Sequence, residues 1–154
     1  MWFSRKQVAK EAPPGNSTGA RAQPGQITTK RLGDAAETLA LTHLTRAGMQ
    51  LVQANYRTPG RGGGEVDLIM RDADGTLVFV EVRQRKGTLH GGAAASVSAV
   101  KQRRIIFAAR YFLLRFASHP PCRFDVVTVQ GSLDAPQTAV VEWLRGAFDA
   151  GSAA

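Results

Sequence analysis

The stretch "GEVDLIMRDADGTLVFVEVRQR" (Gly64–Arg85) constrains the fold most, because as a pair of strands it would be apolar on both faces. Apolar runs at Glu65–Met70 and Thr76–Arg83 flank turn residues at Asp72–Gly75, which is typical of a β-hairpin. Side chains alternate between the two faces of a strand, and odd and even positions both carry large apolar residues. We expect such a sheet to be covered on both faces.

Two helices are predicted to provide this cover. Gly33–Gly48 has an apolar stripe, with Asp34 expected to cap its N-terminus, Glu37 to complete a capping box and Gly48 to end it. A longer helix is predicted at about Val97–Phe116, where apolar residues recur every three or four positions before Pro120 and Pro121.

The remaining segments supply further strands and loops. Met49–Arg57 alternates as a strand does, and Cys122–Gln130 is apolar enough to be a central strand. Thr58–Gly64 and Lys86–Ser96 are expected to be loops, and Thr138–Ala150 fits either a fifth strand or a last helix. The order α-β-β-β-α-β predicts one α/β domain at residues 31–150, with a mixed β-sheet flanked by helices.

Charge and cysteine content indicate the partners and the compartment. The net charge of +8 suggests nucleic acid, but most of that excess falls in residues 1–32, and we interpret residues 1–30 as a disordered basic arm. The single Cys122 cannot form an internal disulfide, so a cytoplasmic location is expected. No apolar run approaches the ~20 residues of a membrane span, so no membrane partner is expected.

The hairpin carries charges at positions that strand alternation places together. Glu65 and Asp67 share a face of the first strand, and Glu81 and Arg83 share a face of the second. If the turn pairs Asp67 with Phe79 or Glu81, the acidic residues of both strands fall on one side. Opposite Cβ atoms lie ~4.5–5.5 Å apart, so two carboxylates could then reach one cation.

This arrangement favours a metal site over a solvated outer face, because charges on a sheet covered on both sides need a partner. Mg²⁺ (or Mn²⁺) takes oxygen ligands and often uses only one or two carboxylates plus a substrate phosphate. Asp67, Glu81 and Glu65 are the candidate metal ligands, and Arg83 could neutralise charge on a phosphate. Lys101 extends the buried stripe of the long helix and could meet a phosphate, whereas Glu37 fits a capping role and a site role about equally.

A family resemblance supports this interpretation. The motifs "GDAAETLALTHLTRAG", "NYR", "GEVDLI", "FVEVRQR", "AVKQRR" and "RFDVV" occur in the order seen in the uncharacterised YraN-like bacterial protein family, over roughly Lys30–Phe148. That family resembles the restriction-endonuclease-like (PD-(D/E)xK) superfamily, whose members carry an acid and then Glu-x-Lys on adjacent strands. The resemblance implies that Asp67 and Glu81 bind metal, that Glu37 is the helix acid and that Glu65 supports them. Arg83 departs from the pattern, because it stands where a lysine is expected.

The expected function is therefore that of a Mg²⁺-dependent endodeoxyribonuclease acting on DNA phosphodiesters, with branched or damaged DNA among the candidate substrates. Its catalytic residues would be Asp67, Glu81, Arg83, Glu37 and Lys101. The alternative is a non-catalytic nucleic-acid-binding module, and a weaker one is a protein-interaction module. The sequence does not separate DNA from RNA, and a homodimer would suit a protein that cuts two strands.

Overall fold

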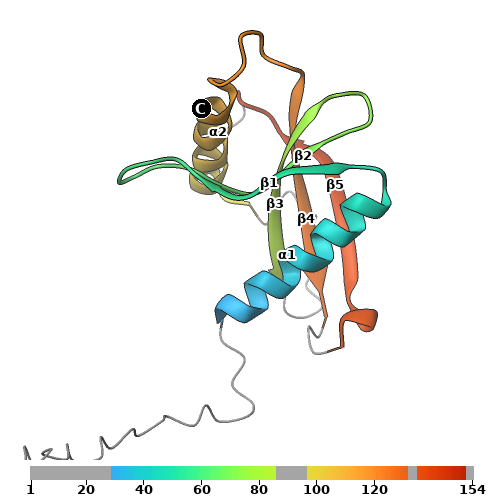
Figure 1. Cartoon of the computed structure of the whole chain (residues 1–154). Coiled ribbons are helices and arrows are strands. Elements are labelled where there is room, and N and C mark those ends of the chain that lie inside the picture. The colour runs from blue at the N-terminus through green and yellow to red at the C-terminus, as the bar shows by residue number, and fades with distance from the viewer. Residues whose placement is uncertain (1–28, 86–96, 132–134, 152–154) are drawn as a thin grey trace, which may run out of the picture.

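The computed structural model describes residues 29–85, 97–131 and 135–151, which form two helices, a short 3₁₀ turn and a five-stranded sheet (Figure 1). The elements in chain order are α1 (Thr29–Arg46), β1 (Gln50–Arg57), β2 (Glu65–Arg71), β3 (Leu77–Arg85), α2 (Ala99–Leu113), β4 (Cys122–Gln130), η2 (Pro136–Thr138) and β5 (Val140–Phe148).

The strands lie in the sheet in the order in which they occur in the chain. β1, β2 and β3 form an antiparallel meander, β4 runs parallel to β3, and β5 is antiparallel to β4. The parallel pair requires a crossover, which α2 provides. The predicted α-β-β-β-α-β order and the mixed sheet are confirmed, and Thr138–Ala150 proves to contain a strand.

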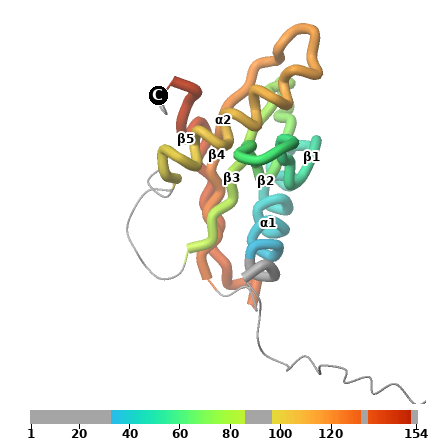
Figure 2. Tube along the Cα trace, turned by 90° about the vertical axis from the view of Figure 1, so that its left-hand side faces the viewer, coloured from blue at the N-terminus to red at the C-terminus, as the bar shows by residue number. Residues whose placement is uncertain are grey.

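One helix packs on each face of the sheet (Figure 2). On one face, Ala40 and Leu44 of α1 pack against Leu68, Val80 and Val127. On the other face, Ile105 and Phe112 of α2 pack against Ile69, Phe79 and Val126. The expectation that both faces of the hairpin are covered is therefore confirmed, because Leu68 and Ile69 are adjacent in sequence yet belong to opposite cores.

The predicted capping box is wrong. α1 begins at Thr29, so Asp34 lies inside the helix, where its carbonyl accepts a hydrogen bond from the Thr38 hydroxyl. Extending a helix adds one hydrogen bond per residue, so it passes through Gly33 despite the modest cost of glycine. This frees Glu37 from any capping role. At the other end Gly48 has a φ of 98°, the left-handed conformation expected of a residue that ends a helix.

The predicted basic arm, residues 1–30, overlaps the first two residues of α1, and the rest of it lies outside the described residues. The whole of the predicted loop Lys86–Ser96 also lies outside them. Within the described part of the chain, neither helix is both long and apolar enough to cross a membrane.

Candidate metal and phosphate site

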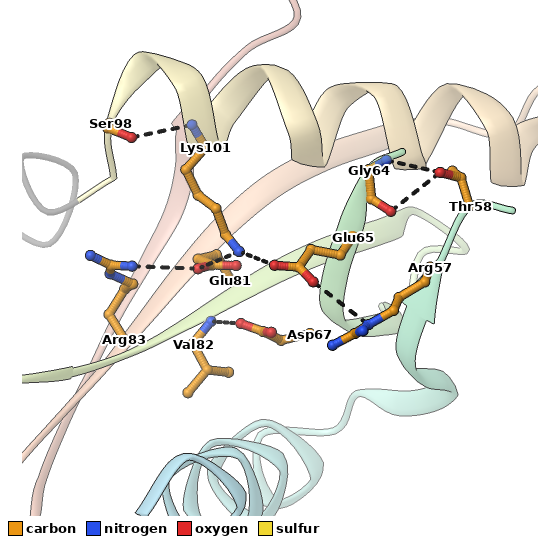
Figure 3. A network of polar contacts seen from close by, with 10 residues as sticks. All are labelled: Arg57, Thr58, Gly64, Glu65, Asp67, Glu81, Val82, Arg83, Ser98 and Lys101. Carbon is orange, nitrogen blue, oxygen red and sulfur yellow. Dashed lines mark hydrogen bonds and ion pairs between the residues drawn. The ribbon is translucent and has the colours of Figure 1, made fainter. Parts of the chain in front are cut away.

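The charged residues of the hairpin meet where β2 and β3 separate (Figure 3). The ladder between these strands runs from Arg71–Leu77 to Leu68–Val80 and continues no further. Beyond it, the Val82 N–H donates a 2.8 Å hydrogen bond to Asp67 Oδ2, so a side-chain carboxylate replaces a backbone acceptor. At this fork the backbone ladder between the two strands ends, and side chains take part in the hydrogen bonding in its place.

Glu81 lies at this fork with only 3% of its side chain exposed. Its Oε1 faces two cations, Lys101 Nζ at 3.6 Å and Arg83 Nη1 at 3.9 Å. Its Oε2 is buried and has no hydrogen-bond partner among the described residues. Burial raises the pKa of Glu81 to about 8; the negative charge of Asp67 and the hydrogen bond that a protonated Glu81 makes with Asp67 act in the same direction. Lys101 and Arg83 therefore do not supply enough positive charge to keep Glu81 ionised in this buried position beside Asp67.

Lys101 reaches this site from the first turn of α2, which Ser98 caps by accepting from the Lys101 N–H. Its ammonium donates a 2.8 Å hydrogen bond to Glu65 Oε1, which lowers the pKa of Glu65. Burial alone would lower the pKa of Lys101, but Glu65 and Glu81 outweigh it and the pKa is raised. Lys101 is therefore a permanent cation in the site.

Gly64 explains why α2 comes so close to β2. A Cβ at this position would overlap the backbone of Arg104 and Ala108, so only glycine permits this contact. Because Glu65 follows Gly64 directly, the close packing brings its carboxylate to Lys101. Arg57, at the end of β1, lies 3.6 Å from the second oxygen of Glu65.

Glu37 approaches the same site from α1. Burial and the nearby charge of Asp67 raise its pKa, and a hydrogen bond with the Asn55 side chain opposes the shift. Asn55 has a φ of 51°, the only positive φ of a non-glycine residue in the described part of the chain. Sequence reasoning missed Asn55 and Arg57, and the "NYR" motif that contains both was the available signal.

These residues fit a hard divalent cation, although no three His, Cys, Asp or Glu side chains of the described segments converge as a ready-made metal site. Asp67 and Glu81 offer carboxylate oxygens as metal ligands, and Glu81 Oε2 is buried and accepts no hydrogen bond from the described residues. Mg²⁺ or Mn²⁺ bound by two carboxylates, with waters and a substrate phosphate completing the shell, matches this donor set. The predicted role of Glu65 as a metal ligand stays a prediction, since both of its oxygens face cations.

Arg83 lies at the solvent side of the site, with 43% of its side chain exposed. Its guanidinium can therefore meet a phosphate that approaches Glu81 from outside. The structure thus brings Asp67, Glu81, Glu65, Arg83 and Lys101 into one place, with Glu37 facing Asp67 from α1.

Comparison with known proteins gives a consistent family assignment. Residues 36–129 match the model of a family described as "Uncharacterised protein family UPF0102". A "UPF0102 protein" of Polaromonas naphthalenivorans (strain CJ2) is 64% identical over 97% of this chain and 99% of its own length. Another, from Cupriavidus taiwanensis, is 53% identical over 79% of this chain and 85% of its own. The chain therefore belongs to the UPF0102 family.

Proposed function

We propose that this protein is a metal-dependent endonuclease that hydrolyses DNA phosphodiesters, with Asp67 and Glu81 holding Mg²⁺ or Mn²⁺. One observation carries the proposal: the buried Glu81 presents an unpartnered oxygen beside Asp67, with two cationic side chains at its other oxygen. The pattern of an acid followed by Glu-x-Arg on adjacent strands, resembling that of the restriction-endonuclease-like superfamily, supports it.

The protein's own residues would divide the work as follows. Arg83 and Lys101 bind the scissile phosphate and stabilise its developing charge. Neither is a base, because arginine is effectively never deprotonated and the pKa of Lys101 is raised. Glu37, whose pKa is raised by burial and by the nearby charge of Asp67, is the side chain best suited to accept a proton from an attacking water. The bound metal would supply Lewis acidity and lower the pKa of that water.

A cleavage assay tests the proposal directly. Full-length protein would be incubated with linear duplex, single-stranded, flapped and four-way-junction DNA, each with Mg²⁺, Mn²⁺ or EDTA. We expect metal-dependent cleavage that Asp67→Asn and Glu81→Gln each reduce by about 100-fold or more, because each removes a metal ligand. Glu142→Gln on β5, an exposed acid outside the site, is the matched control. Equal cleavage by Asp67→Asn and wild type would overturn the site assignment.

A non-catalytic nucleic-acid-binding module is the second candidate, and Arg83 favours it. An arginine at the position of the expected lysine binds phosphate but cannot transfer a proton. Under this alternative, binding depends on salt and not on metal, and no substrate is cleaved in Mg²⁺ or Mn²⁺. Loss of DNA binding on addition of EDTA would exclude it.

A further inference from the structure

The outer side of α2 carries a second apolar face that the sheet does not cover. Val100, Phe107, Tyr111 and Leu114 recur at spacings of seven, four and three residues, so they lie along one side of the helix. All four are exposed, with 53% of Phe107 and 43% of Tyr111 accessible to solvent. Among the described residues, only three other large hydrophobic side chains are exposed.

Arginines border this stripe on both sides. Arg103 and Arg110 lie along one edge, about 10 Å apart along the helix axis, and Arg104 lies along the other. α2 contains no Asp or Glu, so nothing on the helix itself compensates these charges. The face is therefore both aromatic and strongly cationic.

The β1–β2 loop converts one half of this face into a groove. Gly62, Gly63 and Gly64 line a cavity of about 280 Å³ together with Val100, Arg103, Arg104 and Phe107. Figure 1 shows this connection crossing α2 near one end of the helix. Two hydrogen bonds close the base of the β1–β2 loop: the Thr58 N–H donates to the Gly64 carbonyl, and the Gly64 N–H donates to the Thr58 hydroxyl oxygen. Gly64 in the lining of the groove directly precedes Glu65 of the carboxylate site, and α2 supplies both Val100 of the groove and Lys101 of the site.

The charge on this face decides which partner fits it. A second copy of the chain, packed through the same helix, would bring arginine against arginine without an acidic residue on either helix to relieve the repulsion. A polyanion provides the missing negative charge. In a duplex the bases are stacked on one another, so Phe107 and Tyr111 would find no base plane, whereas an unpaired strand offers both phosphates and bases.

We infer that the outer face of α2 and the glycine loop bind an unpaired nucleic-acid strand and lead it to the carboxylate site. Bases stack on Phe107 and Tyr111, while Arg103, Arg104 and Arg110 contact the backbone phosphates. This inference rests on the proposed function and specifies its substrate: a single strand, or a junction or flap that exposes one.

Fluorescence anisotropy in EDTA tests the inference on the full chain. The probes are a labelled DNA strand of about 16 nucleotides and the blunt duplex of the same sequence. We expect the wild type to prefer the single strand, and Phe107→Ala to weaken single-strand binding about 5- to 100-fold with a much smaller effect on the duplex. Phe107→Trp should restore binding. Val140→Ala, at an exposed apolar residue of β5, is the matched control and should bind like wild type.

Arg103→Ala provides a second measurement that does not depend on the aromatic residues. It should reduce the slope of log Kd against log salt by about 0.7, the value for one phosphate contact on a single strand. Arg46→Ala, at an exposed arginine of α1, should leave the slope unchanged. Thermal melting verifies that each variant is folded, which is expected because Phe107 and Arg103 are exposed.

The outcomes separate this inference from the proposed hydrolysis. If Phe107→Ala weakens single-strand binding but no DNA is cleaved in Mg²⁺ or Mn²⁺, the groove stands and hydrolysis does not. If DNA is cleaved and Phe107→Ala changes neither binding nor KM, the groove assignment is wrong while hydrolysis stands. A dimer in sedimentation that Phe107→Ala dissociates, with single-strand affinity unchanged, would overturn the inference and identify the face as a contact between copies of the chain.

Discussion

The described part of the chain buries two carboxylates, Glu81 on β3 and Asp125 on β4, in very different surroundings. Asp125 is fully buried and accepts hydrogen bonds from Trp143 Nε1 and the Gly146 N–H at 3.0 Å, and from Arg123 Nε at 3.1 Å. Glu81 has two cations at 3.6 and 3.9 Å from one oxygen, and its other oxygen accepts no hydrogen bond from a donor of the described residues.

The local backbone explains the difference. The register between β4 and β5 shifts between Phe124 and Val126, and Gly146 on β5 has a φ of 57°. At this irregularity the N–H of Gly146 points toward the Asp125 carboxylate. Asp72, from the β2–β3 turn, pairs with Arg123 Nη1 at 2.9 Å and extends the network, although the buried Arg123 Nη2 has no hydrogen-bond partner among the described residues. The structural carboxylate, Asp125, thus accepts hydrogen bonds from several protein donors, whereas one oxygen of Glu81 accepts none in the described part of the chain and is available to a ligand.

Removing Asp125 should have the largest effect on stability. Asp125→Ala leaves the Arg123 Nε–H, the Trp143 indole N–H and the Gly146 N–H without their acceptor, so we expect a loss of about 3–5 kcal/mol in the free energy of unfolding. Urea unfolding measures it. Trp143→Phe removes one donor alone and should cost less; equal losses from both variants would show that Asp125 is not the centre of the network.

Neutralising Glu81 should stabilise the metal-free protein, in contrast to the loss of stability expected for Asp125→Ala. The pKa of Glu81 is about 8 in the fold against an ordinary value of 4.5. Its contribution to stability is therefore fully present below about pH 4.5 and is lost as the pH rises through 8. Glu81→Gln should keep that contribution at high pH, stabilising the protein by roughly 2–4 kcal/mol above pH 8.

Thermal unfolding in EDTA between pH 5 and pH 9 measures the effect of Glu81→Gln. Glu65→Gln is the matched control, because the pKa of Glu65 is lowered and neutralising it should weaken the fold slightly. Stabilisation by both variants would mean that the loss of a negative charge from the site, and not the environment of Glu81 in particular, accounts for the gain.

Divalent metal should change the stability by an intermediate amount. With metal bound, the stability should no longer fall as the pH rises through 8. Mg²⁺ or Mn²⁺ bound by Asp67 and Glu81 should stabilise the wild type by about 2–3 kcal/mol at a concentration 100 times its Kd. Glu81→Gln should lose most of this gain, whereas Glu142→Gln on β5 should retain it. Equal shifts in melting temperature for Glu81→Gln and the wild type would place the metal elsewhere.

Lys101→Met should have the smallest effect on stability, about 1 kcal/mol, because the Lys101 ammonium and Glu65, its nearer partner, are both partly exposed. Removing a cation from beside Glu65 and Glu81 should tighten metal binding by about 3- to 10-fold, since the carboxylates lose a competing charge. Cleavage should nevertheless fall if Lys101 contacts the phosphate. Metal titrations followed by melting temperature measure the affinity, with Arg46→Gln as control.

Several features of the fold and site were predictable because they depend on local periodicity. The apolar residues on both faces of the hairpin required two covering layers, and strand alternation placed Asp67 and Glu81 near one another. The start of α1 was not predictable in this way. A helix capped by Asp34 and a helix that continues toward Thr29 differ little in free energy, so the local pattern does not choose between them. β5 was equally undecided, since its apolar pattern suits a strand or a helix.

The sequence by itself determined which residues share a face of each strand, because side-chain alternation follows from backbone geometry alone. Only the tertiary structure decided that the β2–β3 ladder ends at Leu68–Val80, that Gly64 brings Lys101 to Glu65, and that Asp125 is satisfied while Glu81 is not. Desolvation and charge compensation depend on which segments pack together, and residues from β2, β3 and α2 meet only after folding.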